Sequence, residues 1–519
     1  MNLSRLNKIF QFCSLILSCL AAALLAAKLI DLSTADLGRH LANGKWVLQN
    51  RDVLYTNFYS DTHQHSPFVN HHWLSGLLFY GIHQLTGFVG LSVSYILLIG
   101  GALAVVSLTN WLEFKSWVVV SAAILSIPMV SYRTEVRPEG ISFLLSAITY
   151  AIANAYTRDK LKPGWLLVLP LIVILWVNCH IYFFFGMIII SAFAAESFLY
   201  SRISDDANKR QQAIDKFRLL TWTVVLCCIA SLINPEGWRL ATYPFRIFGN
   251  YGYMIVENQG IPFFLRRGMH FPIFGPVYIS IGIICTLVAV MVLRRPAQIP
   301  YASLAITLLL AAMSVGAIRN IAMFGLFLVP TICQSLNSLG SGHWRSMSLA
   351  IASAVAMIWF SVTAGPQMFR GSGLGLQPGV LAAAEFFRAH DLKGPMFNNY
   401  DIGGYLIYTL FPDTKVFVDN RPEAYPSYFL TDVYIPAQED NTKWQQLDSA
   451  LHFNVIFFNW HDYTPAGQKF LISRINDPEW VPVFVDPYAL IMVRQTTEHQ
   501  DVISRFAIPK DRFSVKSTD

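Results

Sequence analysis

Charged residues are scarce in this chain of 519 residues: Asp, Glu, Lys and Arg make up 13% of the sequence, against roughly 25% in an ordinary soluble domain. Hydrophobic residues make up 54%, and the mean hydropathy is +0.43. This balance excludes an ordinary soluble protein and predicts a membrane protein. The net charge of +6 does not indicate a nucleic-acid partner, because Lys and Arg gather in the cytoplasmic loops of any multi-spanning protein.

Cysteine is also scarce, and its placement is informative. All seven cysteines fall in or at the ends of apolar runs, and none follows residue 340. This pattern excludes a disulfide framework and a thiolate metal cluster. The sequence lacks a Gly-rich nucleotide fingerprint and a Walker motif, which argues against a nucleotide-linked substrate. It also shows no internal repeat.

Long apolar runs are abundant. Because a helix needs about 20 apolar residues to cross the hydrocarbon, the pattern predicts about eleven spans: 9–30, 88–109, 117–131, 138–156, 164–178, 181–200, 217–233, 272–293, 300–315, 318–338 and 346–364. We expect the first run to be retained as an anchor. Lys and Arg are dense in the loops after residues 156, 200 and 293, which places these loops and the N-terminus in the cytoplasm. An odd number of spans then exports the C-terminal region.

Two domains are expected. Residues 1–366 form the membrane domain, with a long first external loop over 31–87, and residues 367–519 form an exported soluble α/β domain. In the second, β-runs at 394–399, 415–420, 455–460 and 480–493 alternate with helices near 379–390, 402–411 and 466–475. The stretches 73–85 and 238–249 fit either helices lying in the membrane interface or the starts of spans.

Once this orientation is assumed, unusual polar residues fall on one side of the membrane. Ionisable groups at membrane depth are costly and commonly line a polar cavity. Taken singly, each fits a structural role, such as a helix cap or a side chain reaching the headgroups. Together they favour one outward-facing site, formed by Asp36, Arg39, His40, His71, His72, Arg133, Glu135, Arg137, His180, Glu257, Arg319 and Asn320.

The order of short motifs carries a family resemblance. "DLGRHL" (36–41), "NFYSDT" (57–62) and "NHHWL" (70–74) are followed by "EVRPEG", "LWVNCH", "LINPEG" and "AIRNIAMF". This order resembles bacterial members of the GT-C superfamily of integral-membrane glycosyltransferases, which includes protein mannosyltransferases and lipid A aminoarabinose transferases. One departure is local: Gly38 and Arg39 stand where the family pattern has tryptophans.

The resemblance implies a function. Such enzymes pass a sugar from a polyprenyl-phosphate-linked donor to a glycan, lipid or protein acceptor on the outer face of the bacterial cytoplasmic membrane. The chemistry requires an acid to take the acceptor's proton and cations to stabilise the departing phosphate. Asp36 is the expected base, with His40 as the second catalytic residue. Arg133, Arg137 and Arg319 are expected to hold the phosphate through paired donors, and the other residues of this site are expected to contact substrate.

The exported domain offers a second candidate site. Asp419 and Arg421 follow a predicted strand, where α/β domains commonly place ligand groups. They are interpreted either as acceptor-binding residues or as a salt bridge that holds the domain together.

Other functions stay open at this point. A glycan ligase or polymerase that uses a pyrophosphate-linked oligosaccharide would depend more on Arg and His than on Asp36. A transporter or scaffold for lipid-linked glycans predicts polar residues throughout the bilayer and symmetry between halves. No cofactor is assigned, and a divalent cation, Mg²⁺ or Mn²⁺, is left open, since such ions prefer oxygen ligands. The expected partners are the lipid-linked donor, the acceptor and membrane lipids, without nucleic acid.

Overall fold

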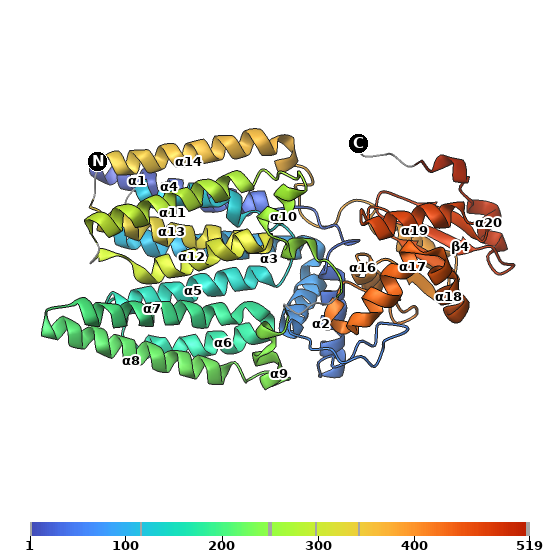
Figure 1. Ribbon diagram of the computed structural model, residues 1–519, viewed down its shortest axis with the longest axis horizontal. Coiled ribbons are helices and arrows are strands. Elements are labelled where there is room, and N and C mark those ends of the chain that lie inside the picture. The colour runs from blue at the N-terminus through green and yellow to red at the C-terminus, as the bar shows by residue number, and fades with distance from the viewer. Residues whose placement is uncertain (1–2, 115–116, 248–251, 296–297, 341–342, 515–519) are drawn as a thin grey trace. The chain divides into compact units, whose positions relative to one another are not determined.

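The structure, a computed structural model, describes residues 3–114, 117–247, 252–295, 298–340 and 343–514 (Figure 1). The chain divides into two compact units. The bundle unit comprises Met1–Lys28, Ser92–Pro244 and Met254–Leu374, and the α/β unit comprises Leu29–Leu91, Phe245–Tyr253 and Gly375–Asp519. The first long loop therefore belongs to the same compact unit as the C-terminal region. The expected division into a membrane domain over 1–366 and an exported domain over 367–519 stays a prediction.

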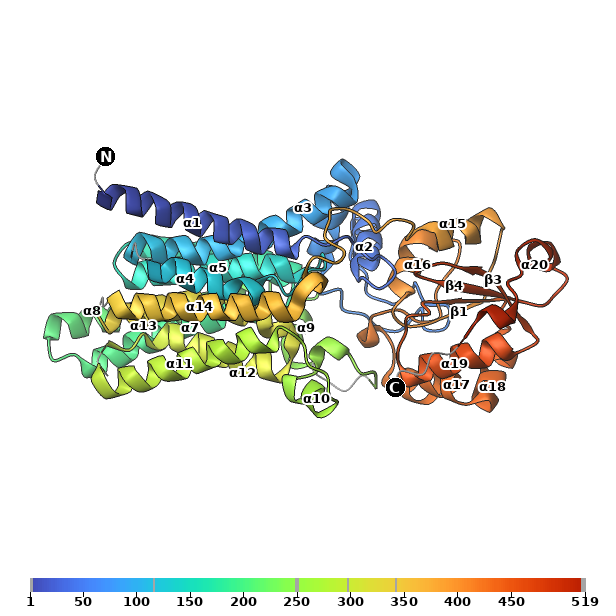
Figure 2. The same cartoon turned by 90° about the horizontal axis from the view of Figure 1, so that it is seen from above.

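The bundle unit consists mainly of α-helices (Figure 2). They are α1 (Leu3–Ala26), the later part of α3 (Trp73–Phe114), α4 (Trp117–Val130), α5 (Glu139–Thr157), α6 (Val168–Cys179), α7 (Phe184–Ile203), α8 (Ala207–Ala230), α11 (Phe274–Arg294), α12 (Tyr301–Gly316), α13 (Ile321–Ser338) and α14 (His343–Ala364). Short helices α9 (Trp238–Ala241) and α10 (Ile261–Arg266) lie in the connection before α11.

The helices confirm a multi-pass integral membrane protein. Among the described residues, seven helices are long and apolar enough to cross a membrane, and three shorter apolar helices cover Trp117–Val130, Pro163–Cys179 and Tyr301–Gly316. Every segment predicted to span is helical over most of its described part, although α1, for example, ends at Ala26 rather than at residue 30. The number of eleven crossings stays a prediction. Helix α13 lies at the centre of the bundle. In its most apolar stretch, 83% of the residues are buried, and the helix packs against α4, α11 and α12.

Short connections bring several helix ends together at one end of the bundle. Only a few residues separate α4 from α5, α6 from α7 and α12 from α13. The end of one helix and the start of the next must therefore lie close together. The polar motifs "EVRPEG", "NCH" and "AIRN" occupy these three connections.

The α/β unit contains a four-stranded mixed sheet with the order β1-β2-β4-β3. Strand β1 (Met396–Asn398) pairs in parallel with β2 (Val455–Phe458), whereas β4 (Leu490–Arg494) is antiparallel to β2 and β3 (Trp480–Val485). The helices after α3 in this unit are α15 (Ala382–Ala389), α16 (Gly403–Leu410), α17 (Ile435–Glu439), α18 (Asn441–Leu451), α19 (Pro465–Asn476) and α20 (Gln500–Phe506). The C-terminal α/β region is thus confirmed.

One predicted strand is absent. Residues 415–420 make only an isolated bridge, between Val416 and Ser60, instead of joining the sheet. The side chain of Asn398 substitutes for a neighbouring strand, because its Oδ1 accepts from the Phe417 amide and its Nδ2 donates to the Val418 carbonyl. The apolar run of this segment is therefore explained by burial rather than by sheet pairing.

Helix α2 (Leu37–Asn50) packs closely on two neighbours through glycines. A Cβ atom at Gly38 would lie 2.5 Å from the Gly404 carbonyl oxygen at the start of α16. A Cβ atom at Gly44 would lie 2.5 Å from the Gly76 carbonyl carbon in the first part of α3. Such distances are too short for any side chain, so Gly38 stands where this backbone packing excludes a tryptophan.

The first part of α3 ends at Gly87, the boundary expected between the first external loop (31–87) and the span over 88–109. Gly87 has φ +65° and ψ −162° and interrupts the helical conformation of Trp73–Phe114. Positive φ favours glycine, which accounts for its place after Thr86. Of the second stretch interpreted as interfacial, Trp238–Ala241 forms α9 and Tyr243–Phe245 a 3-10 turn, while residues 248 and 249 lie outside the described residues.

Candidate functional site

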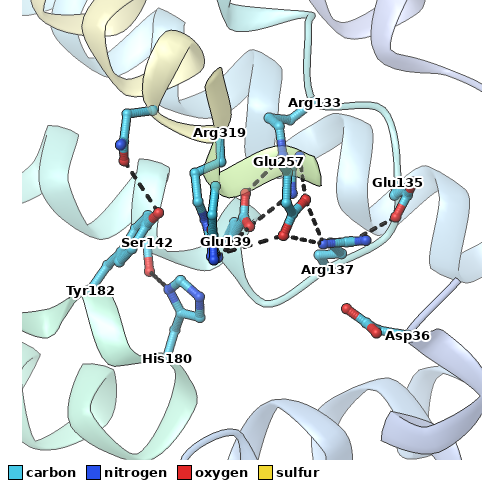
Figure 3. A network of polar contacts seen from close by, with 12 residues as sticks. Asp36, Arg133, Glu135, Arg137, Glu139, Ser142, His180, Tyr182, Glu257 and Arg319 are labelled. Atoms are coloured by element: carbon cyan, nitrogen blue, oxygen red, sulfur yellow. Dashed lines mark hydrogen bonds and ion pairs between the residues drawn. The ribbon is translucent and has the colours of Figure 1, made fainter. Parts of the chain in front are cut away.

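The arginines predicted to bind phosphate converge in the bundle unit (Figure 3). Arg133 follows α4 and lies against Glu139, in the first turn of α5, with Nε and Nη2 each 2.9 Å from a carboxylate oxygen. Arg319, in the turn before α13, places Nη2 3.3 Å from the same carboxylate. The paired geometry on Glu139 is that of a strong Arg–carboxylate contact.

Glu257 links all three arginines. Its Oε2 lies 2.9 Å from Nη1 of Arg133 and 2.9 Å from Nη1 of Arg137, and its Oε1 lies 3.8 Å from Nη1 of Arg319. Burial would raise the pKa of Glu257, but the three guanidinium groups outweigh it and hold the pKa well below its usual range. The carboxylate is therefore ionised at neutral pH.

We call Arg133, Arg137, Arg319, Glu135, Glu139 and Glu257 the arginine cluster. It contains three arginines and three glutamates, so its formal charge is balanced. Glu135 is its most exposed member, at 49% of its side chain, and it pairs with Arg137 at 2.6 Å. An incoming anion must therefore compete with a carboxylate, and Glu257, which bridges the arginines, occupies the position where it would meet all three.

Sequence reasoning missed two residues that contact these arginines. Glu139 is 2% exposed and holds two of the arginines, and Asn258 accepts a hydrogen bond from Arg319 Nη1 at 2.9 Å. Glu139 lies inside the motif "EVRPEG", and Asn258 directly follows the predicted residue Glu257. Both positions were next to residues that the sequence selected, but sequence spacing cannot tell which residue of a loop faces a cation, which for Glu139 lies 180 positions away along the chain.

Two other predicted residues of the bundle unit are buried beside the cluster and hold helix ends. His180 is 2% exposed, and its Nδ1 lies 2.7 Å from the Ser142 hydroxyl, which also accepts from the Trp176 indole. Asn320 accepts from the Tyr182 hydroxyl at 3.3 Å and donates to the Met313 carbonyl near the end of α12. Substrate contact by either residue stays a prediction.

Asp36 precedes the first residue of α2 in the α/β unit but does not cap the helix through its side chain. Its Oδ1 accepts from the Asn420 amide at 2.6 Å and lies 3.2 Å from Nη2 of Arg39. Asn420 Oδ1 in turn accepts from Arg39 Nε at 3.2 Å. The carboxylate of Asp36 is thus held in one orientation and stays partly exposed, at 22% of its side chain.

Glu423 lies in the same unit and carries an altered acidity. Burial raises the pKa of its carboxyl group, and the charge of Arg39 opposes the rise. Glu423 is therefore a second acid that interacts with Arg39, the residue that contacts Asp36, and its pKa lies nearer to neutral pH than that of an ordinary glutamate.

The three predicted histidines of the first loop lie together. The His40 and His72 rings meet edge to face with centroids 5.2 Å apart, and the His71 and His72 centroids are 3.8 Å apart. His40 and His71 are 1% and 3% exposed. Within the described ranges, no group of three His, Cys, Asp or Glu side chains has an arrangement that could hold a metal ion. Roles for these histidines and for a metal stay predictions.

Asp419 and Arg421 have no exposed side-chain surface. Arg421 Nε and Nη2 donate to the two carboxylate oxygens of Asp419, each at 2.7 Å, and Arg421 also donates to Asn57 of the first loop. The Arg421 guanidinium lies 4.7 Å from the Phe68 ring centroid. This geometry ties the first loop to residues 419–421, and acceptor binding by the pair stays a prediction.

The predicted site residues are thus found in two groups. The arginine cluster and its neighbours His180 and Asn320 belong to the bundle unit, and Asp36, Arg39, His40, His71 and His72 belong to the α/β unit. That both groups serve one reaction stays a prediction.

Comparison with known proteins gives a distant likeness. No protein-family model matches the sequence, and no curated protein matches it. Among solved structures, the chain is similar to the cryo-electron-microscopy structure of arabinofuranosyltransferase AftD from Mycobacteria, with a TM-score of 0.49 and 12% sequence identity. The match covers 95% of this chain and 42% of AftD, so the chain spans less than half the length of that protein. A likeness of this degree carries no conclusion about activity.

Proposed function

We propose that this chain is a membrane glycosyltransferase of the GT-C type. It transfers a sugar from a polyprenyl-phosphate-linked donor to a glycan, lipid or protein acceptor on the outer face of a bacterial cytoplasmic membrane. The observation that carries the proposal is the convergence of Arg133, Arg137 and Arg319 on the single carboxylate of Glu257. Ionisable groups of membrane proteins pair with one another and commonly mark a substrate pathway.

The charges suit the donor's phosphate. A phosphodiester carries one negative charge, as the Glu257 carboxylate does, so exchange of one for the other leaves the cluster balanced. When the bond to the sugar breaks, the phosphate gains negative charge and attracts the arginines more strongly than Glu257 does. Stabilisation that grows as the bond breaks accelerates the reaction.

The transfer step then assigns one role to Asp36. The acceptor hydroxyl oxygen forms a bond to the anomeric carbon, and the bond from that carbon to the phosphate oxygen breaks, with its electron pair leaving on polyprenyl phosphate. The hydroxyl proton passes to the Asp36 carboxylate. Support for this role is that Asn420 and Arg39 fix the carboxylate while part of its surface is exposed, as a general base requires.

Binding of undecaprenyl phosphate to the purified protein tests the phosphate site. Glu257→Gln removes the competing negative charge, so we expect roughly tenfold tighter binding, equivalent to about 1.4 kcal/mol. Arg319→Gln should weaken binding by a similar factor. Glu135→Gln is the matched control, because it removes the same charge from a carboxylate that is half exposed and pairs with Arg137. If the Glu257 variant binds undecaprenyl phosphate as the wild type does and unfolds at a lower temperature, the arginine cluster only stabilises the fold.

Transfer from polyprenyl-phosphate-linked sugars in reconstituted membranes tests the base. Asp36→Asn should abolish transfer while undecaprenyl phosphate binding is kept, and full activity of this variant removes Asp36 from the role. Three converging arginines would also suit a pyrophosphate-linked oligosaccharide, as in a ligase or polymerase. In that enzyme Arg319→Gln is inactive whereas Asp36→Asn retains activity, so the two variants separate these functions.

A further inference from the structure

The α/β unit contains a pocket that none of the assigned residues lines. Its volume is about 630 Å³, and its walls come from α2, the first part of α3, α15 and α16, with Phe411 and Pro412 after α16. Ligand pockets commonly measure roughly 300–1,000 Å³. All lining residues belong to this one unit.

Aromatic rings form much of the lining. They come from Trp46 on α2, Tyr80 on α3, and Tyr408 and Phe411 in or after α16. Their positions are set by further rings: Phe58 packs against Trp46 with centroids 4.4 Å apart and against Phe411 at 5.7 Å. Rings held in this way present flat, fixed surfaces at little entropic cost on binding.

Exposed polar groups alternate with these rings. Gln49 and Gln84 each offer a donor and an acceptor, and Lys45, Glu385 and Arg388 add charges of both signs. A prenyl chain would leave these groups without partners, which disfavours it. A strongly anionic headgroup is disfavoured by Glu385. A ligand that has apolar faces and many hydroxyl groups, each able to donate and accept, satisfies both kinds of wall.

We propose that this pocket binds an oligosaccharide. In the role of acceptor site the proposal rests on the function proposed above, whereas saccharide binding itself does not. The pocket and Asp36 share one helix: Asp36 stands just before α2, and Leu41, Lys45 and Gln49 line the pocket along it. At 1.5 Å per residue, Lys45 lies roughly 14 Å from Asp36 along the helix axis. A chain of a few sugars bound in the pocket spans such a distance.

An array of defined bacterial-type oligosaccharides, neutral and uronic, provides the test. The full-length protein is purified in a detergent without a sugar headgroup, since a maltoside would itself compete. One variant is Trp46→Ala. The other combines Gln49→Ala with Gln84→Ala, and both of these glutamines are exposed. The matched controls are Tyr463→Ala, 79% exposed, and the pair Gln445→Ala with Gln446→Ala, exposed on α18 of the same unit.

We expect the wild type to retain at least one oligosaccharide, and each pocket variant to bind it at least tenfold more weakly while both controls bind normally. The glutamine pair keeps the test decisive if Trp46→Ala fails to fold. Retention of no oligosaccharide, or equal retention by the glutamine pair, overturns the proposal. So does a loss of undecaprenyl phosphate binding in the pocket variants, which would make the pocket part of the donor site.

Two further readouts separate this proposal from the proposed function. Asp36→Asn should bind the oligosaccharide as the wild type does while transfer is lost. If Asp36→Asn is fully active, the catalytic assignment fails and the saccharide pocket stands. If the pocket serves the acceptor, the glutamine pair should raise KM for the acceptor without changing kcat, and an unchanged KM overturns the acceptor role.

Discussion

Replacing Asp419 with alanine separates a structural from an acceptor-binding role for the buried pair. The Asp419 carboxylate accepts from the backbone amide, Nε and Nη2 of Arg421 and from the Tyr425 hydroxyl. Neither member of the ion pair has exposed side-chain surface. Asp419→Ala therefore leaves a guanidinium charge buried without its counter-ion. Breaking a buried pair in this way costs about 3–5 kcal/mol.

The magnitude converts to a measurable shift. In a unit of this size each kcal/mol changes Tm by about 2–4 °C, so we expect Asp419→Ala to lower Tm by roughly 6–20 °C. The double variant Asp419→Leu with Arg421→Met removes both charges and should recover most of that loss, because apolar residues commonly replace buried ion pairs without cost. Thermal unfolding of the purified full-length protein, followed by intrinsic fluorescence, provides the measurement. An unchanged Tm in Asp419→Ala, combined with lost acceptor binding, would refute the structural interpretation and support acceptor binding.

Three further outcomes follow from the geometry. Gly44→Ala should lower Tm, although alanine favours a helix over glycine by about 1 kcal/mol. The new Cβ would lie 2.8 Å from the Tyr80 Cβ and closer still to Gly76, and such overpacking costs about 1–3 kcal/mol. Gly81→Ala is the matched control and should not lower Tm, because a Cβ there has nothing within 4 Å. Glu423→Gln should raise Tm at neutral pH, because burial raises the pKa of Glu423 and penalises its charged form. This penalty is present above the pKa of the folded protein and disappears as pH falls through it. An increase in Tm that persists in acid contradicts the pKa shift. The pKa of Glu257 is depressed, so its effect on stability is the opposite. The charged carboxylate stabilises the protein above the ordinary glutamate pKa, and this stabilisation is lost only as pH falls below that value. Glu257→Gln should therefore lower Tm at pH 7 and flatten the acid side of a plot of Tm against pH.

The positions of the apolar helices were predictable because apolar length is a local property. Each predicted span is mostly helical in its described part, since about 20 apolar residues in lipid satisfy their backbone groups only as a helix. The boundary at residue 87 between the first loop and the next span was also visible locally. The strand expected at 415–420 was wrong for a non-local reason: the Asn398 side chain takes the hydrogen bonds that a neighbouring strand would make, and no periodicity in residues 415–420 records this.

The polar residues show the same limit. Sequence reasoning selected Arg133, Arg137 and Arg319 because charge is costly in a membrane, but not Glu139, which holds two of them. Charge selection depends on residue type and membrane context alone, whereas pairing depends on which loops meet at the end of the bundle.

The sequence by itself determined a multi-pass helical membrane protein with a C-terminal α/β region, and it marked the loops where ionisable residues gather. Only the tertiary structure decided that the first loop belongs to the same compact unit as residues 375–519, that Gly38 is required by contact with Gly404, and that rings from α2, α3 and α16 enclose one pocket. The physical reason is that hydropathy and charge act on each residue where it stands, whereas close packing and ion pairing join residues that only folding brings together.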